Sequence, residues 1–119
     1  MNSFKKTYLF LLMLALACSP ADKPDDLLEE AEMVKILYNI HLIEAKISLL
    51  NMSTKDSSKL VFNAWEKQIF AQYKVDTAVY KQSYRYYAAH PQQFDRIYKE
   101  VIKQIEASDK KQPQQRPTR

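Results

Sequence analysis

The only cysteine of this chain, Cys18, lies at the junction between a hydrophobic run and a polar one. The hydrophobic run comprises the ten residues from Tyr8 to Ala17, and it follows a basic pair, Lys5 and Lys6. A single cysteine cannot form a disulfide within the chain, and a free thiol would be a liability in an oxidising compartment. The position of Cys18 therefore favours covalent attachment of a group over redox chemistry.

The segment that precedes Cys18 has the order of a secretory signal: a basic start, a short apolar run and small residues at its end. A membrane-spanning helix needs about 20 apolar residues, so this run is too short to cross a membrane stably. The stretch LALAC, residues 14–18, resembles the lipobox of bacterial lipoproteins, although Ala15 stands where leucine is usual. Ala15-Leu16-Ala17 also suits ordinary signal peptidase, which remains the alternative. We predict a lipoprotein signal peptide over residues 1–17.

Lipid on Cys18 would fix the protein to the cell envelope. Two or three acyl chains bind far more strongly than one, because each buried methylene contributes about 0.8 kcal/mol. Ser19, rather than aspartate, follows the cysteine, and this favours the outer membrane under the enteric sorting rule. Residues 18–28 contain two prolines and no apolar pattern up to Asp26, so we predict a flexible tether there.

His41 and Glu44 form the second chemically suggestive pair. They are three residues apart on a predicted helix, so their side chains are neighbours on one surface. Glu44 falls within the apolar stripe of Met33, Ile40 and Ile47, where burying a carboxylate is costly. The pair could form a buried acidic site or half of a metal site. Alternatively, a tyrosine, a lysine or His41 simply satisfies the carboxylate. Zinc needs three or four ligands, so these two residues alone do not make a zinc site.

An aromatic group on a later helix is the third candidate. Tyr80, Tyr84 and Tyr87 share one helix face, and Tyr86 lies well round the side. Tyrosine is enriched at protein interfaces, so the group could be a contact surface. The alternative is a helix packed between two others. His90 could join a site, but helix-start geometry alone explains its place before a proline.

The elements that position these residues are predicted to be helices. Glycine is absent, which disfavours the tight hairpins of β-structure, and apolar residues recur at helical spacing. The first helix is apolar on nearly every side, so we expect it to be central. We predict an all-α fold, a small bundle of about four helices over residues 29–106, with a disordered tail over 107–119. The expected helices run from Glu29 or Glu30 to about Leu50, from a cap at Ser57 or Ser58 to about Tyr73, from Thr77, with Asp76 as its N-cap, to about Ala89, and from Pro91 to about Glu106.

Charge and motif content exclude several functions. The chain has a net charge of +4, but residues 18–106 hold 12 Lys and Arg against 13 Asp and Glu, a net of −1. A near-neutral body lacks the basic surface that nucleic acids require. There is no glycine for a phosphate-binding loop, no second cysteine and no evident Ser-His-Asp set. We expect neither enzymatic activity nor a cofactor.

Three stretches resemble the small Bacteroidota lipoproteins of domain-of-unknown-function family 4296: KPDDLL, MVKILYNIHLIEAKI and YKVDTAVYKQSYRYYAAHPQQFDRIYKEVIKQI. The resemblance covers roughly residues 24–106 and implies a Gram-negative lipoprotein with a short helical domain; it implies no reaction. We therefore expect a membrane-anchored envelope protein that acts on an unidentified protein partner. The alternatives are a periplasmic holdase, or a ligand- or metal-binding module that uses Glu44 and His41. The candidate interaction or buried polar residues are His41, Glu44, Tyr84, Tyr86, Tyr87 and His90.

Overall fold

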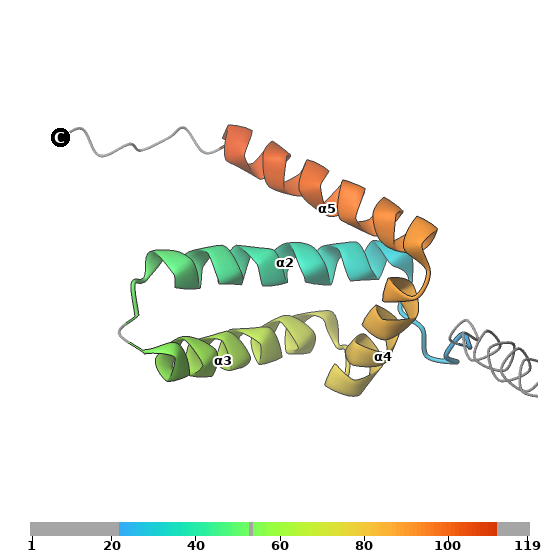
Figure 1. Ribbon diagram of the computed structural model, residues 1–119, viewed down its shortest axis with the longest axis horizontal. Helices are drawn as coiled ribbons and strands as arrows, with labels where there is room; N and C mark the ends of the chain where they lie inside the picture. The colour runs from blue at the N-terminus through green and yellow to red at the C-terminus, as the bar shows by residue number, and fades with distance from the viewer. Residues whose placement is uncertain (1–21, 53, 112–119) are drawn as a thin grey trace, which may run out of the picture.

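A computed structural model describes residues 22–52 and 54–111, so Cys18 and the predicted signal peptide lie outside the described residues. The described chain forms helices and no strand, which confirms the all-α prediction. None of the described helices is long and apolar enough to cross a membrane. The helices are α2 (Glu30–Leu49), α3 (Lys55–Tyr73), α4 (Thr77–Ala88) and α5 (Pro91–Lys111) (Figure 1).

The four helices are arranged around α2. Helices α2 and α3 form an antiparallel hairpin, and α5 runs along the other side of α2 (Figure 1). The short α4 lies at the end of the molecule where α2 begins, and it packs against α5. The prediction of a central first helix is confirmed.

Local capping explains where the helices begin. The backbone N–H of Glu29 donates to the Glu32 carboxylate at 3.0 Å, in a capping box at the start of α2. The predicted Asp76 cap of α4 is confirmed, since its carboxylate accepts the Ala78 N–H at 2.6 Å. The predicted cap of α3, Ser57 or Ser58, was wrong. Thr54 is the cap, because its hydroxyl accepts the Ser57 N–H at 3.2 Å.

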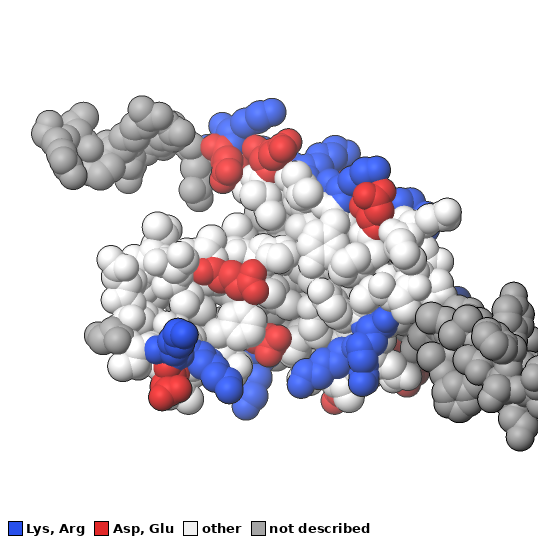
Figure 2. Space-filling model, in the orientation of Figure 1, with Lys and Arg blue, Asp and Glu red and all other residues white. Residues whose placement is uncertain are grey.

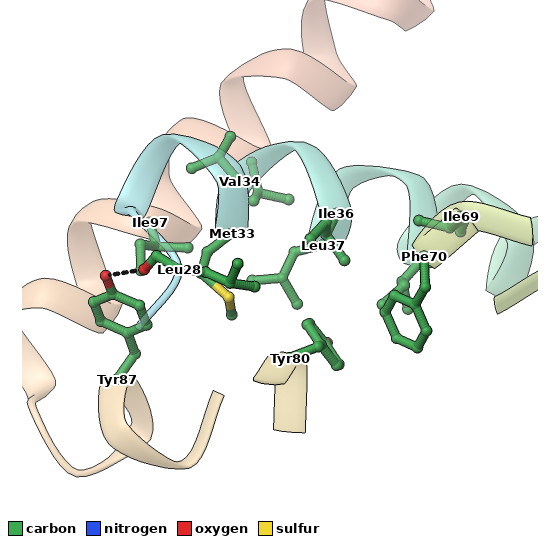
Figure 3. Packing of buried hydrophobic residues seen from close by; sticks show 12 residues of the cluster. Leu28, Met33, Val34, Ile36, Leu37, Ile69, Phe70, Tyr80, Tyr87 and Ile97 are labelled. Atoms are coloured by element: carbon green, nitrogen blue, oxygen red, sulfur yellow. Dashed lines mark hydrogen bonds between the residues drawn. The ribbon is translucent and has the colours of Figure 1, made fainter. Parts of the chain in front are cut away.

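The hydrophobic core lies over the first half of α2. Met33 and Ile36 are fully buried there (Figure 3). Burying a side chain of this size stabilises the fold by about 1.5–3 kcal/mol. The remaining core residues are Leu28, Val34, Leu37, Ile40, Ile69, Phe70, Tyr80, Tyr87, Ile97 and Val101.

The second half of α2 is less well covered than its apolar sequence predicted. On one stripe of the helix, the exposed fraction rises from 5% at Val34 to 84% at Leu49. Helix α5 is inclined to α2 and separates from it toward this end (Figure 1). No buried residue of α2 lies beyond Ile40. The central helix is therefore fully buried only in its first half.

Both predicted boundaries of the helical domain also need correction. Residues 27 and 28 are not free tether, because Leu28 belongs to the core and Leu27 packs against it. Helix α5 does not end near Glu106 but continues to Lys111, so residues 107–111 of the predicted disordered tail are helical. The rest of that predicted tail, residues 112–119, lies outside the described residues. The partly buried Ser108 donates its hydroxyl to the Ile105 carbonyl, and two lysines follow in the last turn, where they complement the helix dipole.

Candidate functional site

His41 and Glu44 do form a pair, but not a buried one. His41 Nδ1 lies 2.9 Å from Glu44 Oε2, and the two side chains are 33% and 51% exposed. The prediction that Glu44 is buried was wrong, because Glu44 lies beyond Ile40, the last buried residue of α2. The His41 ring is tilted against the Tyr98 ring of α5, with centroids 5.9 Å apart. The pair is thus a surface contact beside an aromatic ring.

The pair supplies only two of the three or four ligands that a zinc site needs. Within residues 22–52 and 54–111, no three His, Cys, Asp or Glu side chains are grouped so that they could hold a metal ion. His90 does not join His41 and Glu44 but contacts Tyr86 instead.

A series of aromatic contacts connects α3, α4 and α5. Phe70 of α3 lies 4.9 Å from Tyr80 of α4, measured between ring centroids. Tyr84 meets Phe94 of α5 edge-on at 5.6 Å, and Phe94 meets Tyr98 at 4.7 Å. Such pairs contribute about 0.5–1.5 kcal/mol each beyond the area they bury. Helix α4 is thus packed between α3 and α5, and its tyrosines provide much of that packing.

Burial raises the pKa of three tyrosine hydroxyls, those of Tyr80, Tyr87 and Tyr98. Burial is the main cause of the raised pKa of Tyr80 and of Tyr87. Partial burial, together with the neighbouring Tyr84 hydroxyl, raises the pKa of Tyr98 to about 12. The phenolate form is disfavoured because charge is poorly solvated in the core. The neutral Tyr87 hydroxyl serves as a hydrogen-bond donor to the Leu28 carbonyl oxygen.

Tyr86 and His90 form a separate contact at the α4–α5 corner. Their rings stack with centroids 4.0 Å apart, and His90 Nδ1–H donates to the Tyr86 carbonyl oxygen at 2.6 Å. The His90 carbonyl in turn accepts the N–H of Gln93 at 3.0 Å, in the first turn of α5. His90 thus orients the start of α5, as its place before the proline predicted.

A buried polar contact joins α4 to Leu28, two residues before α2 begins. The backbone N–H of Leu28 donates to Ser83 Oγ at 3.0 Å, and the Tyr87 hydroxyl donates to the Leu28 carbonyl oxygen at 2.6 Å (Figure 3). Ser83 is 0% exposed and Tyr87 is 3% exposed. Both main-chain groups of one buried residue are therefore satisfied by side chains that lie more than fifty positions away. We call Leu28, Ser83 and Tyr87 the clasp.

Large apolar side chains remain uncovered at the opposite end of α2. Leu49 and Leu50 are 84% and 55% exposed, and Leu60 of α3 is 71% exposed. We call these three residues the hairpin end, because they flank the turn between α2 and α3. Figure 2 shows mostly uncharged atoms over the α2 side of this end, with charged residues gathered along α5 and the lower edge. Ile102, on the half of α5 that extends toward this end, is also exposed.

The family model described as "Domain of unknown function (DUF4296)" matches residues 24–111. The chain belongs to the DUF4296 family. No curated protein and no solved structure matches it. The DUF4296 match begins before the clasp residue Leu28 and ends at Lys111, the last residue of α5. The family match therefore includes residues 27–28 and 107–111, which the structure adds to the predicted helical domain.

Sequence reasoning missed two members of the clasp in this DUF4296 domain. Ser83 lies between Tyr80 and Tyr87 on the inner face of α4, three and four positions from them. A serine at that register is a signal of a buried hydrogen bond, because an unsatisfied hydroxyl there would be costly. Leu28 carries no such signal, since its side chain is ordinary and the clasp uses its backbone.

Proposed function

We propose that this DUF4296 protein is a lipid-anchored protein of the Bacteroidota cell envelope that acts by binding another protein. The proposal that the protein binds another protein rests on one observation, the exposed apolar side chains of the hairpin end. Lipid on Cys18 would hold the domain at the outer membrane, and the hairpin end would bind the partner.

The hairpin end is suited to binding because its leucines are costly to leave in water. A fully buried leucine contributes about 1.5–3 kcal/mol relative to an exposed one, so a partner that covers Leu49, Leu50 and Leu60 gains binding free energy. Clustered apolar residues on a soluble domain commonly mark interaction sites, whereas single ones need no explanation. Leu49 and Leu50 are consecutive, and Leu60 lies near the start of the helix that follows them.

The anchor rests on the sequence around Cys18, which combines a basic start, a ten-residue apolar run and a lipobox-like junction. Mass spectrometry of the mature N-terminus tests it. We expect a diacylglyceryl group on Cys18, with an acyl chain on its amine. A mature chain that begins at unmodified Cys18 or at Ser19 would rule out the anchor.

Affinity capture of the native protein from solubilised membranes, after cross-linking, tests the protein-binding role. We expect one stoichiometric partner, which a Leu49→Gln/Leu60→Gln double variant loses. Ala88→Gln is the matched control, because Ala88 is exposed on α4 at the other end of the molecule. If the partner stays bound to the double variant, or if no protein is captured above background, the role is wrong.

The uncovered leucines also favour a second candidate, a holdase for unfolded envelope proteins. A holdase suppresses the aggregation of many unrelated clients, whereas an adaptor does not. An aggregation assay with two unrelated unfolded proteins separates the two roles. Suppression of both by the wild-type domain, and loss of suppression in Leu49→Gln/Leu60→Gln, would favour the holdase.

A further inference from the structure

The clasp attaches the segment before α2 to a helix far away in the sequence. We call residues 24–28 the strap. Leu28 is 8% exposed, and its N–H and carbonyl groups are both held by α4 side chains. The helix itself does not require these bonds, because α2 begins two residues later with its own capping box. The clasp therefore acts on the strap and not on the start of α2.

Further contacts hold the strap on both sides of Leu28. The Leu27 N–H donates to the Pro24 carbonyl at 3.3 Å, which turns the chain. Two residues after the strap, at the start of α2, the Glu30 carboxylate accepts from Arg96 Nε of α5 at 3.2 Å. The strap is thus fixed to α4 through the clasp, while Glu30, the first residue of α2, is bound to α5.

We infer that the clasp is a positioning device that sets where the tether leaves the domain, and so how the domain is held at a membrane. The positioning rests on the lipid anchor of the proposed function, whereas the clasp itself does not. With the strap held, the chain from Cys18 to residue 23 spans at most about 20 Å, even when fully extended. With the strap released, the chain from Cys18 to Leu28 spans at most about 40 Å.

The clasp also sets a direction. The strap leaves the molecule beside α4, at the end where α2 begins, and the α2–α3 turn lies at the other end (Figure 1). The two ends are separated by the length of α2, whose 20 residues span about 30 Å. An anchor attached to a clasped strap therefore keeps the α4–α5 corner near the membrane and presents the hairpin end away from it.

Hydrogen exchange on the full chain in detergent tests the clasp without any anchor or partner. In the wild type, we expect the Leu28 amide to exchange about 100-fold more slowly than the exposed Asp26 amide. Ser83→Ala should speed the exchange of the Leu28 amide at least about tenfold, because this N–H then lacks the Ser83 hydroxyl as its acceptor. Tyr87→Phe should also speed the exchange and should increase proteolytic cleavage within residues 22–28.

The matched control is Tyr86→Phe, which removes one hydroxyl from the neighbouring tyrosine. In the described part of the chain, that hydroxyl makes no hydrogen bond. We expect Leu28 exchange and strap cleavage to be unchanged in this control. Fast Leu28 exchange in the wild type would overturn the inference. So would equal exchange and cleavage in wild type, Ser83→Ala and Tyr87→Phe.

Orientation is measured on the full chain bound to phosphatidylethanolamine vesicles that carry a headgroup quencher. Fluorophores are placed singly at Gln92, on the α4–α5 corner, or at Asn51, in the α2–α3 turn. In the wild type, we expect the label at Gln92 to be quenched more strongly than the label at Asn51. In the Ser83→Ala/Tyr87→Phe double variant, this difference in quenching between the two labels should fall by about half or more. Equal quenching in the wild type would overturn the positioning role. If the chain does not stay on the vesicles, the anchor of the proposed function has failed, and hydrogen exchange still decides the clasp.

Discussion

The Tyr87 hydroxyl donates a 2.6 Å hydrogen bond to the Leu28 carbonyl oxygen, across 59 positions of sequence. This bond and its companion from Leu28 to Ser83 attach the N-terminal strap to α4. They make the strap part of the folded DUF4296 domain, in agreement with a family match that begins at residue 24. The clasp is therefore a structural element whose removal should be measurable in stability as well as in local exchange.

Ser83→Ala should destabilise the domain by about 1–3 kcal/mol, because it leaves the buried Leu28 N–H without an acceptor. Urea denaturation followed by circular dichroism gives the unfolding free energy. Ser48→Ala is the control: Ser48 is exposed on α2, so we expect a change within about 0.5 kcal/mol. Equal effects of the two substitutions would show that the Ser83 bond contributes nothing.

Met33→Ala should cost about 2–5 kcal/mol, since Met33 is 0% exposed and its truncation leaves a cavity. Leu49→Ala should change the unfolding free energy by no more than about 0.5 kcal/mol, because that side chain is 84% exposed. Thermal or chemical denaturation of the two variants provides the comparison. A large loss in Leu49→Ala would mean that the hairpin end is covered in solution, for example by a second copy.

Stability should fall at alkaline pH. The folded-state pKa of Tyr98 is about 12, above the ordinary value of 10.0, so the unfolded chain loses this proton first. The stabilisation is fully present below about pH 10 and is lost as the pH rises toward about 12. Unfolding free energies of wild type and Tyr98→Phe across this window, with an ultraviolet titration of the tyrosines, check it. A pH dependence that is identical in the two proteins would exclude Tyr98 as a source.

Glu44→Gln should change stability by no more than about 1 kcal/mol, because exposed ion pairs contribute little. Added zinc should not raise the melting temperature of the wild type, since His41 and Glu44 are two ligands only. Differential scanning fluorimetry with and without zinc measures both effects. A zinc-dependent rise that disappears in Glu44→Gln would instead favour the metal-binding alternative.

Much of the local structure could be predicted because its causes are local. Helical spacing of apolar residues and the absence of glycine indicated four helices. Asp76 was recognisable as a cap because a cap acts on residues two or three positions away. Thr54 was missed because several polar residues in the same loop could each have started α3.

The candidate site was predicted less well, and Glu44 shows why. A helical wheel gives the side of α2 on which Glu44 lies, but not whether a neighbouring helix reaches that turn. Helix α5 is inclined to α2, so coverage ends near Ile40 and Glu44 remains exposed. The length and crossing angle of α5 therefore decided whether Glu44 is buried.

The sequence by itself determined the helices, most of their limits and the predicted lipid site at Cys18, since these depend on residues close together in the chain. Only the tertiary structure decided that the strap is clasped by Ser83 and Tyr87, and that Leu49, Leu50 and Leu60 stay uncovered. The clasp uses the backbone of Leu28, and any residue with an N–H and a carbonyl offers the same groups. No side-chain pattern could therefore distinguish that partner in advance.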